Sequence, residues 1–469
     1  MKDLTESKKY DLIVMIDSSS NDYEEHKILN AMGYDILVID HHLAEKYSEY
    51  AIVINNQLSE HYPNKGLSGV GVCYKFLEYF ERKEQLPCRT KNYLDIVALG
   101  IIGDVMDVTT LENRWIITYG LSHLNNKFLK ELVEKQAFSL KYPEVPLNST
   151  GVAFYLVPLI NALIRVGSPI EKERLFQAFI SPEVEVPSTK RGEKGLYETI
   201  ATQSVRNCVN AKSRQTRERD KAAELLDIQI LENNLNENKV LILNADDLNV
   251  SNNLTGLCAM GVAAKYKKPV LLGRITPDGK TMKGSIRNKD GSPIKDLRRF
   301  LLNSGLMEYV EGHSSAAGYG LPVSKIGQLI EYCNTQLRNI DLGEGSYEAD
   351  FIVRANCQYL TNLIFELSAG AALWGQNNPE ALIAVNSINI SKNSIAIIGK
   401  NLDTIKFKLN GINYIQFKAT DLIEQLDSYS ENLIINLVGT PNINSWGGVE
   451  TPQIQIKDIE IKELNLEGF

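Results

Sequence analysis

The sequence predicts a multidomain α/β protein whose parallel sheet comes first and whose small β-barrel comes last. Over the first 110 residues, short apolar runs alternate with helical patterns, and a long polar helical pattern follows later in the chain. Closely spaced runs of alternating polar and apolar residues fill the last part. Strands separated by helices are typical of a parallel sheet, whereas closely spaced strands with polar turns favour a barrel.

Size and composition predict several domains. The chain has 469 residues, of which 43% are hydrophobic and 23% charged, and a single core rarely grows beyond about 250–300 residues. We expect four parts: an α/β domain over residues 1–194, a connecting helix over 195–235, a smaller α/β domain over 236–340 and a barrel domain over 341–469.

Cysteine usage and hydropathy predict a cytoplasmic protein that does not enter a membrane. The six cysteines are far apart and form no C-x-x-C pair, which argues against a disulfide scaffold or a zinc ribbon. The longest apolar stretch, residues 152–164, is shorter than the roughly 20 residues that cross a bilayer. The charged N-terminus lacks the apolar segment of a signal peptide.

Three strands are expected near the N-terminus, at residues 11–17, 35–40 and 51–55, with helices at 68–83 and 91–104. The first two strands end in Asp17 and Asp40. Because functional groups gather at the carboxyl ends of parallel strands, both carboxylates are candidate site residues.

Further along, residues 195–234 predict one long polar helix of the kind that bridges domains. A strand at 239–246, a helix at 254–267 and a strand at 269–275 then restart the α/β pattern. After residue 347, one amphipathic helix precedes the six short segments of the expected barrel.

Positive charge is concentrated in two stretches of an acidic chain. The formal net charge is −8, yet residues 190–221 carry +5 and residues 265–299 carry +8. The net charge argues against non-specific coating of nucleic acid, whereas the two basic stretches favour a polyanion path along one groove. Solvated helix faces remain the alternative for either stretch alone.

A cluster of acids and histidines points to metal-assisted chemistry. Asp40, His41 and His42 end a strand, Asp17 ends the preceding one, and Asp104 follows the end of a glycine-containing helix. Carboxylates and imidazoles at converging strand ends are suitable ligands for Mn²⁺ or Mg²⁺, which a phosphodiester hydrolase needs. Each residue alone has an ordinary explanation as a turn former or a surface histidine.

The same residues resemble a known family. VIDHH at 38–42 resembles the signature of the DHH phosphoesterase superfamily, and the ordered motifs downstream resemble the RecJ single-strand-specific exonuclease over nearly the whole chain. These motifs are LSGVGVCYKF (67–76), ALGIIGDVMDV (98–108), LINALIRVG (159–167), GSIRN (284–288), GHSSAAG (312–318), WGQNNPEA (374–381) and NSWGGVETPQIQIKDI (444–459).

The resemblance implies roles for the acid and histidine cluster around a two-metal site of Mn²⁺ or Mg²⁺. Asp17 would be shared by both ions, and His41 and Asp104 would bind one of them. Asp40 would orient its neighbour, and His42 would face the scissile phosphate.

The resemblance also implies a phosphate-binding set in the DHH-associated domain and just before it, formed by Arg165, Gly284, Ser285, Arg287, Gly312 and His313. Gly284 would let the backbone approach a phosphate, and Arg287 would offer a bidentate fork. From the residues alone, GSIRN is equally explained as a glycine turn in a basic loop, and GHSSAAG as a tight structural turn.

Two departures from the family pattern stand out. The acidic Asp-x-Asp-x-Asp-Gly-like motif that supplies ligands for the second metal has no counterpart before Asp17. Three explanations stay open: a true start upstream, a separate polypeptide that supplies this piece, or an impaired protein with only one ion fully ligated. Glu311 stands where the family usually has glycine.

The C-terminal barrel resembles the oligonucleotide-binding (OB) domain of the family, although residues 341–469 carry a net charge of −8. We expect its aromatic residues Phe407, Tyr414 and Phe417 to belong to the barrel core. A modest role in DNA binding is expected of the lysines, at positions 400, 406, 408 and 418.

The function implied by the resemblance is 5′-to-3′ hydrolysis of single-stranded DNA to mononucleotides in repair or recombination, with a single-strand-binding protein or a helicase as partner. Two alternatives stay open. One is a catalytically impaired binding protein or split-enzyme subunit. The other is a phosphodiesterase of short oligonucleotides or cyclic dinucleotides, against which the long helix and the barrel count.

Overall fold

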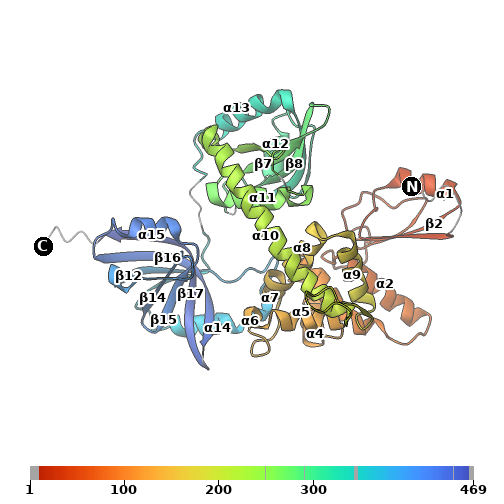
Figure 1. Ribbon diagram of the computed structural model, residues 1–469, viewed down its shortest axis with the longest axis horizontal. Coiled ribbons are helices and arrows are strands. Elements are labelled where there is room, and N and C mark those ends of the chain that lie inside the picture. Colours follow the sequence, from red (N-terminus) through yellow and green to blue (C-terminus); the bar gives the residue numbers. More distant parts are fainter. Residues whose placement is uncertain (1–9, 249, 290, 343–346, 447, 464–469) are drawn as a thin grey trace. The chain divides into compact units, whose positions relative to one another are not determined.

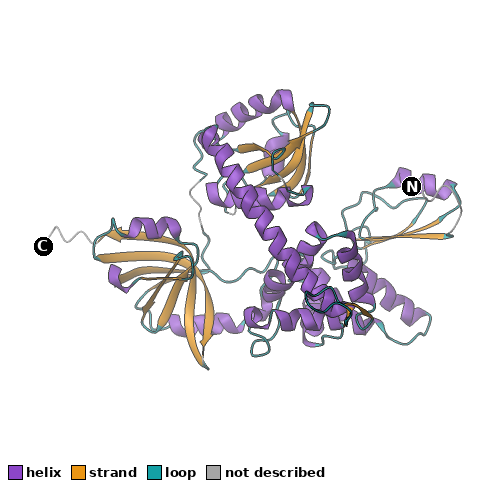
Figure 2. Cartoon of the chain, in the orientation of Figure 1, coloured by secondary structure: helices purple, strands orange, loops and turns teal. Residues whose placement is uncertain are grey.

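The chain forms two compact units, Met1–Val157 together with Glu348–Phe469, and Pro158–Tyr347 (Figure 1, Figure 2). The structure is a computed structural model that describes residues 10–248, 250–289, 291–342, 347–446 and 448–463. The charged N-terminus, residues 1–9, lies outside the described residues. The bounds of the four expected parts stay a prediction.

The first unit begins with the expected parallel sheet. Its strands are β1 (Leu12–Ile16), β2 (Asp35–Asp40) and β3 (Ile52–Asn55), arranged in the order β1-β2-β3, with α1 (Tyr23–Ala31) between the first two. Both pairings are parallel, and Asp40 lies opposite Asn55. The carboxyl ends of all three strands therefore meet at one edge.

Helices follow the sheet: α2 (Gly69–Lys83), α3 (Leu94–Gly103), α4 (Leu111–Ser122), α5 (Lys127–Lys135), α6 (Ala137–Leu140) and α7 (Ser149–Gly151). Helix α3 is almost entirely buried. A side chain at Gly120 would lie 2.2 Å from the Leu94 carbonyl oxygen, so α4 packs closely on α3. This packing holds the first half of α3 against α4.

A π-helical turn, η3 (Val152–Leu156), joins α7 to α8 (Val157–Val166). Among the described residues, the run Ser149–Val166 is long and apolar enough to cross a membrane by length and composition alone. Val152, Leu156 and Leu163 are nevertheless fully buried within the protein, as in the core helix of a folded domain.

The second unit contains the long helix that the sequence predicts, now bounded as α10 (Ile200–Glu232). Helix α9 (Pro169–Ile180) and the small ladder of β4 (Glu185–Pro187) with β5 (Tyr197–Thr199) precede it. Because Tyr197–Thr199 pairs as a strand, the helix begins five residues later than expected.

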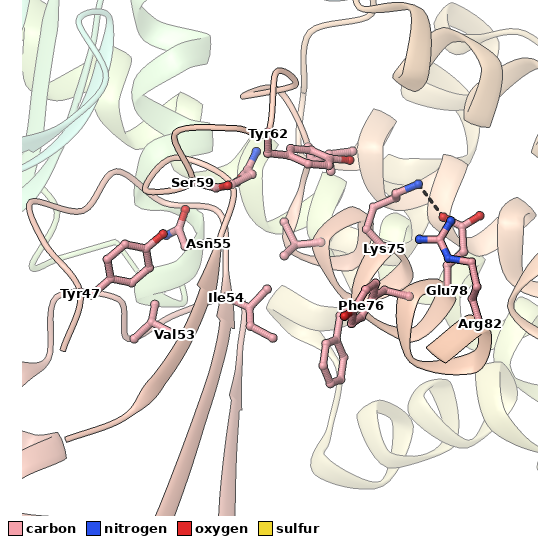
Figure 3. A pocket seen from close by; sticks show the side chains of 14 residues that line it. Tyr47, Val53, Ile54, Asn55, Ser59, Tyr62, Lys75, Phe76, Glu78 and Arg82 are labelled. Carbon is pink, nitrogen blue, oxygen red and sulfur yellow. Dashed lines mark hydrogen bonds and ion pairs between the residues drawn. The ribbon is translucent and has the colours of Figure 1, made fainter. Parts of the chain in front are cut away.

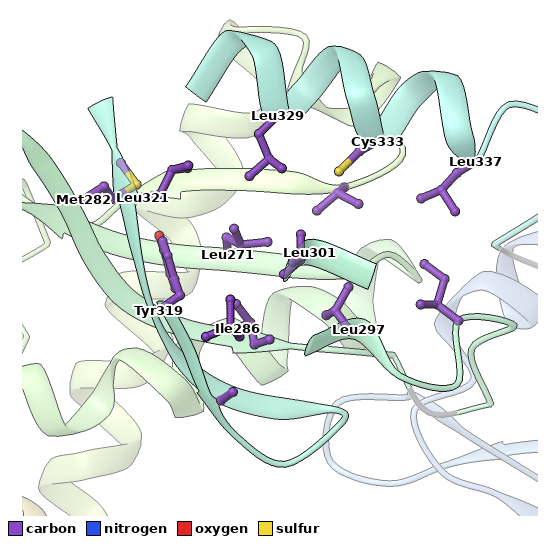
Figure 4. Packing of buried hydrophobic residues seen from close by; sticks show 14 of the residues in the cluster. Leu271, Met282, Ile286, Leu297, Leu301, Tyr319, Leu321, Leu329, Cys333 and Leu337 are labelled. Carbon is purple, nitrogen blue, oxygen red and sulfur yellow. The ribbon is translucent and has the colours of Figure 1, made fainter. Parts of the chain in front are cut away.

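A five-stranded sheet forms the rest of this unit, in the order β6-β7-β8-β10-β9. Its elements are β6 (Leu241–Asn244), α11 (Thr255–Tyr266), β7 (Val270–Ile275), β8 (Thr281–Arg287), α12 (Leu297–Leu302), β9 (Tyr309–Gly312), β10 (Ala316–Pro322) and α13 (Ile326–Gln336). Only β6 and β7 are parallel. Helices α12 and α13 pack on the sheet through Leu297, Leu301, Leu329 and Cys333 (Figure 4).

The C-terminal part is a seven-stranded sheet, in the order β11-β12-β16-β17-β15-β14-β13. Its elements are β11 (Phe351–Arg354), α14 (Leu360–Ala369), β12 (Ile383–Ser391), β13 (Ala396–Ile398), β14 (Thr404–Leu409), β15 (Ile412–Gln416), α15 (Thr420–Leu426), β16 (Asn432–Trp446) and β17 (Val449–Glu463). All six expected short strands are present. Among the described strands, no ladder joins β11 to β13, so closure of this sheet into the expected barrel stays a prediction.

Aromatic residues of this sheet only partly follow the expectation. Phe407 and Tyr414 are buried and stacked, with ring centroids 4.9 Å apart, as expected of core residues. The expectation for Phe417 is wrong, because this side chain is 54% exposed just beyond the end of β15.

Candidate metal centre and anion-binding cluster

Asp17 lies directly after β1 in a left-handed backbone conformation, with φ of 61°. Its N–H donates to the Ile39 carbonyl of β2 at 2.9 Å, which fixes the turn against the sheet. The carboxylate points at the start of α2, where a side-chain carbon added at Gly69 would lie 2.2 Å from its Oδ1 atom. The space beside Asp17 therefore exists because residue 69 is glycine.

His41 lies between Asp17 and Asp104 and contacts both carboxylates. Its Nε2 atom lies 3.2 Å from Asp17 Oδ1 and 3.3 Å from Asp104 Oδ2, and its side chain is only 9% exposed. Asp104 caps the end of the buried helix α3, where its N–H donates to the Gly100 carbonyl at 2.9 Å. One imidazole nitrogen and two carboxylates thus converge from three different elements.

Asp40 is buried and organises the backbone that follows it. Its carboxylate accepts hydrogen bonds from the backbone N–H groups of Ser20, His41 and His42, and it contacts His42 Nδ1 at 2.7 Å. Burial alone would raise the pKa of Asp40, but the bonds from His42, Ser20 and the backbone outweigh it and lower this pKa to about 2. The carboxylate is therefore ionised at neutral pH and positions its neighbours.

His42 is 60% exposed, unlike its neighbour. The hydrogen bond to Asp40 raises the pKa of His42 above its ordinary value, against the effect of burial. With Nδ1 held by Asp40, the Nε2 atom is free to meet a ligand as a hydrogen-bond donor.

Asn55 and Ser20 also support this cluster, although neither was singled out in the sequence. Asn55 Nδ2 donates to the His42 carbonyl at 2.9 Å and to Ser20 Oγ at 2.8 Å. Asn55 ends β3, so the strand-end rule that selects Asp17 and Asp40 applies to it equally. Gly69 could not be found by such a rule, because its importance depends on the packing of α2.

The residues present fit a hard divalent cation. Donor atoms of Asp17, Asp40, His41 and His42 all lie within 4.8 Å of one another, and Asp104 adds a further carboxylate next to His41. Carboxylate oxygens with a neutral imidazole suit Mn²⁺, and carboxylate-rich sites suit Mg²⁺. Because residue 69 is glycine, the Asp17 carboxylate can lie against the start of α2 within 3.2 Å of His41 Nε2.

A cavity of about 550 Å³ lies between β3 and α2, next to this centre (Figure 3). Ile54 and Asn55 line it from β3, and Lys75 and Phe76 line it from α2. Lys75 forms ion pairs with Glu78 at 2.5 Å and Glu112 at 3.3 Å, so its charge is locally neutralised.

In the second unit, two of the expected phosphate-binding residues, Ser285 and Arg287, lie together at the start of α11. A side-chain carbon at Gly256, in the first turn of α11, would lie 2.3 Å from Arg287 Nη2 and 3.4 Å from Ser285 Oγ. Both side chains thus meet the helix N-terminus, where unpaired N–H groups favour an anion. The explanation of GSIRN as a turn is wrong, since these residues lie in β8 up to Arg287.

Arg165 belongs to the same electrostatic environment. Burial and the positive charge of Arg165 lower the pKa of Arg287, and burial, Arg219 and Arg165 together lower that of Lys212. Because these like charges repel one another, an anion bound among them would stabilise this part of the protein. Arg165 also lines a hollow of about 710 Å³ with Lys221 and Ser251.

The expected glycine and histidine of this cluster have different roles. The expectation that Gly284 admits a phosphate is not supported, because a side chain there would lie 2.0 Å from the Leu272 carbonyl of β7, so the neighbouring strand fills the space. Gly312 has φ of 132° and ends β9. His313 is exposed in the tight turn before β10, as GHSSAAG alone suggests.

Comparison with known proteins identifies the family. Residues 2–101 match the DHH family, N-terminal domain, and residues 354–458 match the RecJ OB domain. The chain is 38% identical over 456 residues, 96% of its length, to the putative SPbeta prophage-derived single-strand DNA-specific exonuclease YorK of Bacillus subtilis, of which it covers 78%. The chain belongs to the RecJ family of the DHH superfamily.

Other RecJ proteins agree with this assignment. RecJ of Bacillus subtilis is 25% identical over 97% of the chain, which covers 55% of that protein. The crystal structure of Thermus thermophilus RecJ in complex with Mn²⁺ has the same fold, with a TM-score of 0.72 at 20% identity over 97% of this chain and 63% of that one. The chain therefore spans somewhat less than two thirds of that RecJ. Because residues 354–458 match the RecJ OB domain, the C-terminal sheet is an OB domain.

Proposed function

We propose that this chain is a metal-dependent exonuclease that hydrolyses single-stranded DNA from the 5′ end and releases mononucleotides. The observation that carries the proposal is the convergence of Asp17 and Asp104 on one nitrogen of His41. The activity named for the similar YorK and RecJ proteins supports it.

Asp17, His41 and Asp104 would hold Mn²⁺ or Mg²⁺. When bound, such an ion supplies a hydroxide nucleophile at neutral pH and neutralises phosphoryl oxygens. Asp40 does not need to bind the ion, because its carboxylate is already occupied by four hydrogen-bond donors. Its task is to fix the backbone of His41 and the ring of His42.

His42 would hold a proton at Nε2 and donate it as a hydrogen bond to an oxygen of the scissile phosphate. The raised pKa favours the protonated ring, and Asp40 fixes its orientation, so little reorganisation is needed as negative charge develops on the phosphate. Its exposure leaves the outer edge of the ring open to a substrate.

Arg287, Ser285 and the N-terminus of α11 would bind a phosphate of the strand. Arg287 contributes a planar guanidinium and Ser285 a hydroxyl, and Arg165 adds a further positive charge to the same unit. The OB domain would bind the single strand further along.

The proposal also includes closure of the C-terminal sheet into a barrel, and a helicase or single-strand-binding protein as partner. The six free thiols support a location in the reducing cytoplasm.

The test is mononucleotide release from 5′-labelled single-stranded DNA with Mn²⁺, comparing the chain with an Asp104→Asn variant. Asn keeps the shape of the side chain but removes a charged ligand, so we expect release to fall at least 100-fold. Glu134→Gln, an exposed acid on α5, is the matched control and should retain full activity.

Release that persists in Asp104→Asn would contradict the proposed centre. Tight, salt-sensitive binding without any release by the unmodified chain would instead favour a catalytically impaired binding protein. Cleavage restricted to short oligonucleotides would favour the small-substrate phosphodiesterase.

A further inference from the structure

We propose that Asn113, in the first turn of α4, is a positioning residue for the metal centre. Its buried side-chain amide joins the segment that follows Asp104 to the segment that precedes α2, and so sets how Asp104 and Asp17 lie around His41. This inference rests on the proposed function, and it adds a residue from outside the cluster of ligands.

The carboxylates of Asp17 and Asp104 are held only in part by packing. Their side chains are 58% and 48% exposed, whereas that of His41 between them is 9% exposed. The place of each carboxylate therefore depends largely on the backbone that carries it. For Asp104 this backbone is the end of α3, and for Asp17 it is a turn whose carboxylate rests against Gly69 at the start of α2. A residue that fixes both regions also fixes the spacing of the ligands.

Asn113 donates hydrogen bonds into both regions. Its Nδ2 atom lies 2.7 Å from the carbonyl oxygen of Asp107, in the loop that follows Asp104. The same atom lies 2.6 Å from the carbonyl oxygen of Gly66, just before the α2 residue Gly69. A side-chain amide has two N–H groups, so each carbonyl can receive its own hydrogen bond. The side chain is 0% exposed, so bulk water does not compete for these bonds.

Neighbouring groups fix the orientation of this amide. Asn113 Oδ1 accepts a hydrogen bond from Asn64 Nδ2 at 3.1 Å. Asn64 is held in turn, because its Oδ1 accepts the Gly66 N–H at 2.9 Å and its Nδ2 also donates to Glu112 at 2.9 Å. Thr110, the N-cap of α4, accepts the Asn113 N–H at 3.4 Å and holds the first turn of the helix. The amide nitrogen therefore faces the two carbonyls.

The two joined segments are in close contact where the amide links them. A side-chain carbon added at Gly66 would lie 3.3 Å from Asp107 Cβ and 3.5 Å from Asn113 Nδ2. Alanine at position 113 would remove both donors from the two carbonyl groups and leave a gap between the segments. The loop after Asp104 could then shift relative to the start of α2, and the two carboxylates would no longer be held at one spacing.

The experiment measures Mn²⁺ binding to the full chain by isothermal titration, with Asn113→Ala as the variant. Loss of a group that supports metal ligands typically costs about 10–100-fold in affinity, and Asn113 acts through backbone, so we expect a loss of about fivefold or more.

Asp95→Asn is the matched control, because Asp95 is equally buried and ties the first turn of α3 to the Asn125 and Asn126 N–H groups, both at 2.7 Å. This variant should lower the stability of the fold and leave Mn²⁺ affinity unchanged.

A double-mutant cycle separates positioning from a general structural role. In an Asp104→Asn background, one of the two ligands whose spacing Asn113 sets is already lost. Asn113→Ala should then cause less than about a twofold further loss of Mn²⁺ affinity, because the two changes act on the same interaction. A purely structural effect would give the same loss in both backgrounds.

Gly66→Ala tests the same junction in a protein that keeps the amide. Its added methyl group would press on Asp107 at 3.3 Å and move the two segments apart. We expect Mn²⁺ affinity to fall about threefold, less than in Asn113→Ala because the hydrogen bonds remain. This variant decides the test if Asn113→Ala does not fold.

The proposal is overturned if Asn113→Ala, or Gly66→Ala where the first variant does not fold, binds Mn²⁺ as tightly as the unmodified chain. It is also overturned if Asp95→Asn weakens Mn²⁺ binding equally, or if the loss is the same in the Asp104→Asn background. In these cases, Mn²⁺ binding and mononucleotide release by the unmodified chain would leave the proposed function standing. An unmodified chain that neither binds Mn²⁺ nor releases mononucleotides would overturn both proposals together.

Discussion

Gly69 carries no side chain, yet it decides where the Asp17 carboxylate lies. The added carbon of Gly69→Ala would lie 2.2 Å from Asp17 Oδ1 and 2.9 Å from its Cβ, so the carboxylate must turn away from His41. Because displaced ligands and their supports typically cost 10–100-fold in metal affinity, we expect Mn²⁺ to bind at least 10-fold more weakly. Isothermal titration with Mn²⁺ measures this directly.

Gly261→Ala is the matched control, because a side chain there meets nothing within 4 Å. Alanine in an open helical position is expected to stabilise the fold slightly and to leave Mn²⁺ binding unchanged. Equal Mn²⁺ affinity in both variants would mean that Asp17 does not bind the ion.

At the scale of single residues, the sequence identified site residues where a general rule links a position in the chain to a place in the fold. Asp17 and Asp40 follow strands, and His41 follows Asp40, so sheet geometry places them together. Gly69 escapes such a rule because its neighbour in space is more than 50 residues away in the chain. Phe417 was misplaced because alternation in a short strand does not say where the strand stops.

Among the elements, α10 shows how a helix boundary is set by its neighbours. Its N-cap Thr199 accepts a hydrogen bond from the Thr202 N–H, while the two preceding residues pair with β4. Glu198 then forms a bidentate pair with Arg206 inside the helix, with one N–O distance of 2.6 Å. Local sequence identifies the helix but not the strand that delays its start.

This pair makes a prediction about pH. The hydrogen bond from Arg206 lowers the pKa of Glu198 to about 2, below its ordinary value of 4.5. A carboxyl whose pKa is lower in the folded state adds stability above pH 4.5, and that stability is lost as the pH falls from about 5 to 2. Glu198→Gln should therefore cost about 1 kcal/mol of unfolding free energy at pH 7 and progressively less below pH 5.

Urea denaturation of both proteins across this pH range measures the difference. Glu193→Gln, an acid in the exposed loop between β4 and β5 that pairs with Lys190 and Ser188, serves as the comparison and should show a smaller effect. A cost of Glu198→Gln that stays constant from pH 7 to pH 3 would contradict the role given to this ion pair.

For the molecule as a whole, charge is divided between the two units. Pro158–Tyr347 contains 26 Lys and Arg against 22 Asp and Glu, a net charge of +4, which leaves −12 for the first unit. Composition alone located both basic stretches in what proves to be one unit. It could not tell which of those cations are already neutralised, as Arg206 and Arg214 are by Glu198 and Glu171.

The cations that repel one another are the ones expected to bind phosphate, and this gives a prediction for the salt dependence of DNA binding. Each phosphate contact to a single strand contributes about 0.7 to the slope of log affinity against log salt. Arg287→Gln should weaken binding of single-stranded DNA in EDTA and reduce this slope by about 0.7, because it removes one such contact near α11. Lys190 is 57% exposed and its ammonium is paired with Glu193, so Lys190→Gln should leave both affinity and slope nearly unchanged.

Fluorescence anisotropy at several salt concentrations gives both quantities. If Arg287→Gln weakened binding without changing the slope, the guanidinium would be supporting the packing of β8 against Gly256 rather than neutralising a phosphate.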